Sequence, residues 1–79
     1  MVDEIKRLIE EQKVFFGIKE SLKKSGEIDK AILSSDCRDE VKNLLSANKV
    51  KFEISDLSKN EISSRLGLSF KCEVFGLQK

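Results

Sequence analysis

The residues most able to do chemistry lie in segment 17–24, Gly-Ile-Lys-Glu-Ser-Leu-Lys-Lys. A glycine directly before a predicted helix leaves the first backbone N–H groups accessible, and the helix dipole favours an anion there. Lys19 and Lys23 are four residues apart and share a helix face, with Lys24 beside them. The segment therefore predicts a basic surface for phosphate groups; the alternative is an ordinary solvated Lys–Glu helix face.

Glu20 helps to decide between a phosphate-binding surface and an ordinary solvated helix face. A carboxylate beside phosphate-binding lysines would be repelled by a nucleic-acid backbone, unless it accepts hydrogen bonds from guanine imino and amino groups. The mixture of Lys and Glu is thus compatible with reading base edges on a specific RNA shape. The alternative is an intrahelical pair of Glu20 with Lys23 or Lys24.

Three further positions could join this site. Asp36 follows a predicted strand at its carboxyl end, where ligands gather in open α/β sheets; its alternative role is to cap the next helix. Arg65 lies near a predicted helix end, where it could simply favour the dipole. Phe70 and Lys71 enter a predicted strand and could supply base stacking and phosphate contact, although a Phe taken alone at such a position more often belongs to the core.

The usual parts of enzymes and metal sites are missing from the composition. The chain has no His and only two Cys, so it lacks the commonest general base and cannot complete a zinc site or a disulfide scaffold. Cys37 lies at a predicted helix start, which could lower its pKa, but a small packing residue is the favoured interpretation. We expect no enzyme, no metal and no cofactor.

Length and charge narrow the class of protein. The 79 residues allow one small domain, and 15 Lys and Arg against 14 Asp and Glu give a net charge of +1. This balance argues against sequence-blind polybasic binding, yet segment 13–24 carries four Lys and one Glu while segment 1–12 carries two positive and four negative charges. No apolar run could span a membrane, and the acidic N-terminus is unlike a secretory signal, so a cytoplasmic protein without a membrane partner is expected.

Hydrophobic periodicity positions these residues in alternating helices and strands. Helices are predicted to begin near residues 2, 18, 36 and 58, the last with a Ser58–Glu61 capping box and an end at Gly67. Gly26 is expected to end the second helix in a left-handed conformation, and Asp36 to cap the third. Strands are predicted at 14–16, 31–33, 50–54 and 70–77. The alternation predicts an α/β fold with a sheet between helices.

Three motifs in this order resemble the kink-turn RNA-binding ribosomal protein superfamily, whose branches include the archaeal and eukaryotic large-subunit proteins called "L thirty e" and "L seven A e". They are Gly17-Ile18-Lys19-Glu20-Ser21-Leu22-Lys23, Ala31-Ile32-Leu33-Ser34-Ser35-Asp36, and Asn60-Glu61 with Arg65-Leu66-Gly67 and Phe70-Lys71. The resemblance implies a three-layer α-β-α sandwich around a four-stranded mixed sheet, with residues 1–79 as a single RNA-binding domain. The chain departs from the family pattern in having no Pro and in carrying Ser63 where a glycine is usual.

The resemblance also implies a function and a site. The implied function is non-enzymatic recognition of a kink-turn or similar bent internal loop by a ribosome-associated protein, or by a component of another ribonucleoprotein with its RNA and protein partners. In the family, the glycine-led turn enters the widened groove beside tandem sheared G·A pairs, the Glu reads a guanine, and the last loop covers a flipped-out nucleotide. The alternative is a protein-interaction or regulatory module of the same fold. The RNA-binding residues expected are Gly17, Ile18, Lys19, Glu20, Ser21, Lys23, Lys24, Asp36, Arg65, Leu68, Ser69, Phe70 and Lys71.

Overall fold

The computed structural model describes residues 2–79, apart from the side chain of Val2. Helices and strands alternate along this part of the chain, with one short 3-10 turn at Ser25–Glu27. The elements are α1 (Val2–Glu10), β1 (Val14–Phe16), α2 (Ile18–Lys23), β2 (Ile28–Leu33), α3 (Asp39–Ala47), β3 (Phe52–Ile54), α4 (Lys59–Leu66) and β4 (Val74–Gln78).

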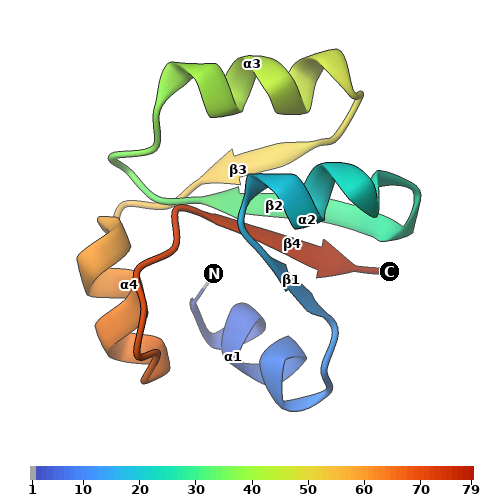
Figure 1. Cartoon of the computed structure of the whole chain (residues 1–79). Coiled ribbons are helices and arrows are strands. Elements are labelled where there is room, and N and C mark those ends of the chain that lie inside the picture. The colour runs from blue at the N-terminus through green and yellow to red at the C-terminus, as the bar shows by residue number, and fades with distance from the viewer. Residues whose placement is uncertain (1) are drawn as a thin grey trace.

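The four strands form one mixed sheet in the order β1-β4-β2-β3. The last strand, β4, is antiparallel to both of its neighbours, while β2 and β3 are parallel. Consequently β1, β2 and β3 all run in one direction, and their carboxyl ends lie at the edge of the sheet where β4 begins (Figure 1).

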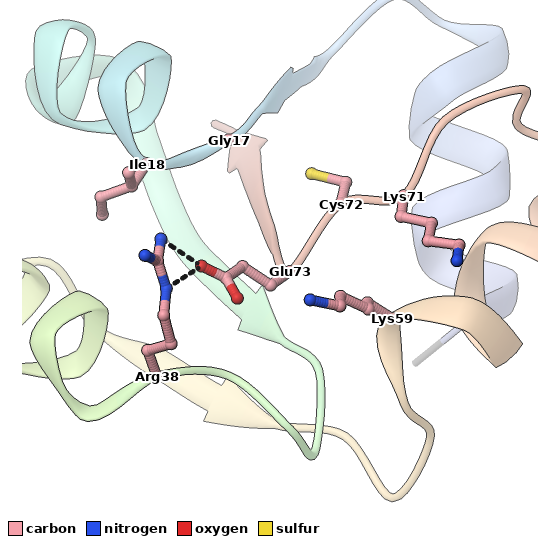
Figure 2. Close-up of a pocket in the computed structure, with 7 residues that line it drawn as sticks. All are labelled: Gly17, Ile18, Arg38, Lys59, Lys71, Cys72 and Glu73. Atoms are coloured by element: carbon pink, nitrogen blue, oxygen red, sulfur yellow. Dashed lines mark hydrogen bonds and ion pairs between the residues drawn. The ribbon is translucent and has the colours of Figure 1, made fainter.

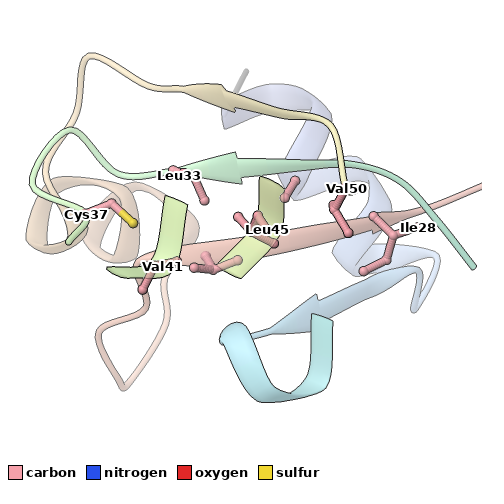
Figure 3. Close-up of a cluster of buried hydrophobic side chains, with 8 residues drawn as sticks. Ile28, Leu33, Cys37, Val41, Leu45 and Val50 are labelled. Atoms are coloured by element: carbon pink, nitrogen blue, oxygen red, sulfur yellow. The ribbon is translucent and has the colours of Figure 1, made fainter. Parts of the chain in front are cut away.

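Two apolar clusters, one on each face of the sheet, hold the layers together. Alternation along β2 sends Ala31 and Leu33 to the face covered by α2 and α3, and Ile32 to the face covered by α1 and α4. Phe75 and Leu77 of β4 join Ile32 in the second cluster. Figure 3 shows the first cluster, which α3 covers through Val41 and Leu45. The architecture confirms the predicted three-layer α-β-α sandwich.

The ends of the elements correct several sequence predictions. Gly26 does not take a left-handed conformation, because α2 ends at Lys23 with Lys24 as its C-cap and the chain passes directly into the 3-10 turn that contains Gly26. The last strand begins at Val74 rather than near residue 70, since residues 68–73 form a loop over the edge of the sheet. The second strand begins earlier than predicted, at Ile28.

Other predicted helix signals are confirmed. The Ser58 hydroxyl accepts a hydrogen bond from the Glu61 N–H, and the Glu61 carboxylate accepts one from the Ser58 N–H, which completes the capping box of α4. Gly67 ends that helix with φ of 71°. None of the helices described here is both long and apolar enough to cross a bilayer.

Candidate functional site

The edge of the sheet at which β1, β2 and β3 end gathers the candidate site residues. The turn after β1 supplies Gly17 and Ile18, the loop after β2 supplies Arg38, and the first residue of α4 supplies Lys59. The loop leading into β4 approaches from the other direction with Lys71, Cys72 and Glu73. Because the carboxyl ends of parallel strands meet here, this edge is where open α/β sheets commonly bind ligands.

These segments enclose an open pocket of about 460 Å³. The lining has three cationic side chains and one carboxylate: Arg38 bonds Glu73, Lys59 extends toward it, and Lys71 lies farther away with its ammonium group directed away from Glu73 (Figure 2). Lys59 and Lys71 form no ion pair with any described residue. Charge in the pocket is therefore mainly positive and largely uncompensated, which favours a ligand bearing several negative charges.

Arg38 and Glu73, two of the residues that line the pocket, form an ion pair with two hydrogen bonds. Oε1 of Glu73 accepts hydrogen bonds from Arg38 Nε at 3.1 Å and from Nη2 at 2.9 Å. The Glu73 side chain is only 16% exposed, whereas that of Arg38 is 63% exposed. The hydrogen bonds to Glu73 raise the pKa of Arg38, so the guanidinium stays charged. Because the Arg38 side chain is largely exposed, the rest of the guanidinium is accessible to a ligand.

Gly17 shapes the turn beside these charges. Its φ of 89° and ψ of 163° lie in a region that is almost exclusive to glycine. The Gly17 N–H donates to the Val74 carbonyl at 3.0 Å, which ties the turn to the first residue of β4. No atom lies within 4 Å of where a Cβ on Gly17 would be, so the backbone here is open to close approach by a ligand.

Asp36 braces the site rather than lining it. Its Oδ1 accepts a hydrogen bond from the Lys59 N–H at 3.0 Å, which joins the loop after β2 to the start of α4. The Ser34 hydroxyl and the Lys59 amide lower the pKa of Asp36 because they favour the ionised carboxylate. The prediction that Asp36 caps the following helix is wrong, since α3 begins at Asp39 and has Arg38 at the N-cap position without a side-chain cap.

Comparisons with known proteins bear on the fold. Neither a protein-family model nor a curated protein sequence matches the chain. Among solved structures, a protein of unknown function from Bacillus halodurans matches with a TM-score of 0.80 at 14% identity, over 99% of this chain and 83% of that one. The 15.5 kD RNA-binding protein of Giardia lamblia matches with a TM-score of 0.75 at 18% identity, over 99% of this chain and 70% of that one. The likeness shows that these chains share a fold.

The structure brings some of the predicted site residues together. Gly17, Ile18 and Lys71 line the pocket. Lys19 and Glu20 follow directly in α2 and are exposed, although they do not line the pocket. Phe70 is 48% exposed and makes a T-shaped contact with Phe16 at 5.4 Å between ring centroids, so part of the residue is accessible from solvent.

Other predicted residues lie elsewhere. Ser21 is fully buried against Gly76 of β4, so its side chain is a packing group and the prediction that it contacts RNA is wrong. Leu68 packs on the cluster beneath α1 and α4. The remaining members are exposed but outside the pocket: Lys23, Lys24, Arg65 and Ser69.

Sequence reasoning missed four pocket residues, namely Arg38, Lys59, Cys72 and Glu73. Arg38 and Lys59 follow the second and third strands by only a few residues, so the rule that ligands gather at carboxyl strand ends could have found them. Glu73 carried no such signal, because its partner Arg38 lies 35 residues away.

The two thiols are structural. Cys37 and Cys72 are free and buried, and desolvation raises the pKa of each. The Cys72 thiol donates a hydrogen bond to the Val74 carbonyl at 2.9 Å. Within residues 2–79 no group of three or more acidic or thiol side chains is arranged to hold a metal ion. The packing interpretation of Cys37 is therefore confirmed.

Proposed function

We propose that this chain is an RNA-binding protein that recognises a kink-turn or similar bent internal loop, as a ribosomal protein or as a component of another ribonucleoprotein. The observation that carries the proposal is the pocket at the carboxyl edge of the sheet, whose lining includes Arg38, Lys59 and Lys71 with Glu73. The shared fold with an RNA-binding protein supports it, as does the resemblance of segment 17–23 to the kink-turn superfamily.

The three cations bind backbone phosphates, which position the RNA without reading its sequence. Arg38 suits a planar, two-bond contact with phosphate, and Lys59 and Lys71 act as mobile point charges. The open backbone at Gly17 lets the edge of the RNA groove approach closely.

Glu73 and Glu20 supply selectivity. A carboxylate within a phosphate-binding surface is unfavourable for a plain backbone but accepts hydrogen bonds from the imino and amino groups of a guanine. These donors are exposed where bases are unpaired or joined in sheared G·A pairs, and are occupied in an ordinary duplex. The exposed Phe70 can stack on a base that leaves the helix. The protein acts by binding and performs no catalysis.

The test compares three RNAs by fluorescence anisotropy at two salt concentrations: a kink-turn, the same RNA with its G·A pairs disrupted, and a plain duplex. The native chain should prefer the kink-turn at both salt concentrations. The double variant Arg38→Gln, Lys59→Gln should bind more weakly, and the slope of its affinity against salt should fall by the amount expected for about two phosphate contacts. The control is Lys6→Gln, Arg7→Gln, which removes the same charge from exposed residues of α1 and should have little effect on binding. Equal, weak binding to all three RNAs would overturn the proposal.

A further inference from the structure

A second group of lysines lies at the opposite end of the sheet from Glu73. Lys49 and Lys51 come just before β3, and Lys79 follows β4, at the end marked C in Figure 1. Together with Ser25, Gly26 and Asp29 they line a pocket of about 360 Å³. Its floor is apolar and consists of Ile28 and Val50, which lie at one end of the cluster in Figure 3.

The charge in this second pocket is also largely uncompensated. All three lysines are exposed, and none forms an ion pair with a described residue. Asp29 is the single acidic lining residue, so the lining carries three positive charges and one negative charge. Three exposed ammonium groups against one carboxylate suit phosphate, which lysine commonly binds as a point charge.

The backbone at Lys49 supports a functional role for this side chain. After α3, the Lys49 N–H donates to the Ser46 carbonyl at 3.0 Å and the Val50 N–H to the Leu45 carbonyl at 2.9 Å. This helix ending places Lys49 at φ of 59°, a position that usually takes glycine. The equivalent position after α4 is indeed glycine, Gly67. Among the residues that the structure describes, Lys49 and Gln12 are the two non-glycine residues with a positive φ, and of these Lys49 is the one that lines a pocket.

We propose that this second pocket binds the backbone phosphates of an adjoining RNA segment, so that the protein holds one bent RNA at both ends of its sheet. The inference rests on the proposed function only in taking RNA as the ligand. The molecule measures 30 × 26 × 18 Å between its Cα extremes, so an RNA that bends around it passes both pockets within about ten base pairs, at roughly 3.4 Å of helix axis per base pair. No base-reading role is assigned here, because the lining offers mainly positive point charges.

The chain itself provides a matched control. Gln12 ends α1 with the same hydrogen bonds and also has φ of 59°, but it does not line either pocket. Lys49→Gly with Lys51→Gln relieves one left-handed residue and removes two charges from the pocket. Gln12→Gly with Lys6→Gln and Arg7→Gln makes the same two changes elsewhere. Both variants should melt at or above the native temperature, which separates loss of binding from loss of fold.

The experiment follows backbone amide shifts in the ¹⁵N-labelled chain during titration with a short plain RNA duplex. Shifts should concentrate and saturate at residues 49–51 and 79. The Lys49→Gly, Lys51→Gln variant should bind several-fold more weakly, with a salt slope lower by about 1.5, while the matched control keeps the native slope. Asp29→Asn, which removes the one acidic lining group, should bind more tightly than the native chain.

Two further titrations complete the test. One asks whether the bound phosphate belongs to RNA or to a small molecule, and the other separates this inference from the proposed function. Inorganic pyrophosphate should produce only weak shifts; saturation with pyrophosphate at the strength seen with RNA would overturn RNA as the ligand. Shifts spread evenly over all surface lysines, or equal binding by both variants, would also overturn the inference. With a kink-turn RNA, the amide shifts of Gly17 and Ile18 report on binding at the first pocket. A lack of binding at the first pocket can therefore be told apart from a lack of binding at Lys49 in the second.

Discussion

At the scale of single residues, the pair of Arg38 and Glu73 is central to the candidate site. Glu73 holds one edge of the guanidinium while the remaining surface of Arg38 stays exposed. The same carboxylate keeps negative charge among cations that would otherwise bind any phosphate backbone. Under the proposed function, this one side chain would orient a phosphate-binding group and also oppose indiscriminate binding.

Glu73→Gln tests this double role. The change keeps the shape but removes the charge, so affinity for a plain duplex should rise by about tenfold, as expected for about 1.4 kcal/mol of relieved repulsion. Preference for the kink-turn over the duplex should fall correspondingly. Glu10→Gln removes an exposed carboxylate of α1 that lines neither pocket and serves as the control. Unchanged duplex binding by Glu73→Gln would contradict the assigned role.

The lowered pKa of Asp36 predicts that the stability of the chain depends on pH. The folded protein lowers the pKa of this carboxyl, mainly through the Ser34 hydroxyl, so its contribution to stability is present above the unfolded pKa of about 3.9. That contribution is lost as pH falls through the lower folded value. Urea unfolding measured from neutral to strongly acid pH should show that the free energy of unfolding falls less on acidification in Asp36→Asn than in the native chain. Asp3→Asn provides a charge-matched comparison, and an identical pH profile in Asp36→Asn would exclude the effect.

At the scale of elements, the contact of α2 with β4 fixes the turn that carries Gly17. A Cβ on Gly76 would lie 2.8 Å from Ser21 Oγ and 2.9 Å from Ile28 Cδ1, so glycine lets the helix approach the sheet. The Ser21 hydroxyl is buried and has no hydrogen-bond partner among the described residues. The helix therefore packs closely at this point without a polar interaction that would compensate for Ser21.

Gly76→Ala should destabilise the chain by about 1–3 kcal/mol through overpacking. Ser21→Ala should be neutral or stabilising, because it removes an unsatisfied buried hydroxyl from a helix. In the double variant Gly76→Ala, Ser21→Ala, much of the lost free energy of unfolding should be recovered. Urea unfolding of the native chain, both single variants and the double variant measures this recovery. Additive effects of the two changes would argue against direct contact. Unchanged RNA binding in Ser21→Ala would confirm that Ser21 is a packing residue.

The sequence predicted most elements because their signals are local. Alternating apolar residues, the Ser58–Glu61 box and Gly67 each depend on a few neighbouring residues, and all three are confirmed. Asp36 was misassigned because its hydrogen-bond partner is the Lys59 amide, 23 residues away. Likewise, Glu73 meets Arg38 only because β4 lies beside β2 in the sheet. Pairings set by strand order and register have no local signature.

At the scale of the whole molecule, the net charge of +1 conceals a separation of charge. One end of the sheet carries Arg38, Lys59 and Lys71, and the other carries Lys49, Lys51 and Lys79. Acidic residues elsewhere on the surface, several of them in α1, balance these cations. Binding should therefore depend on the shape of the RNA and on salt, rather than on overall charge.

The footprint of a kink-turn RNA on the chain tests the central claim most directly. In an amide-shift titration of the ¹⁵N-labelled protein, the earliest and largest shifts should fall at Gly17, Ile18, Arg38 and residues 71–73, which line the first pocket. The same RNA with disrupted G·A pairs should shift these amides far less. A footprint centred away from this edge of the sheet, or one that is identical for both RNAs, would contradict the account.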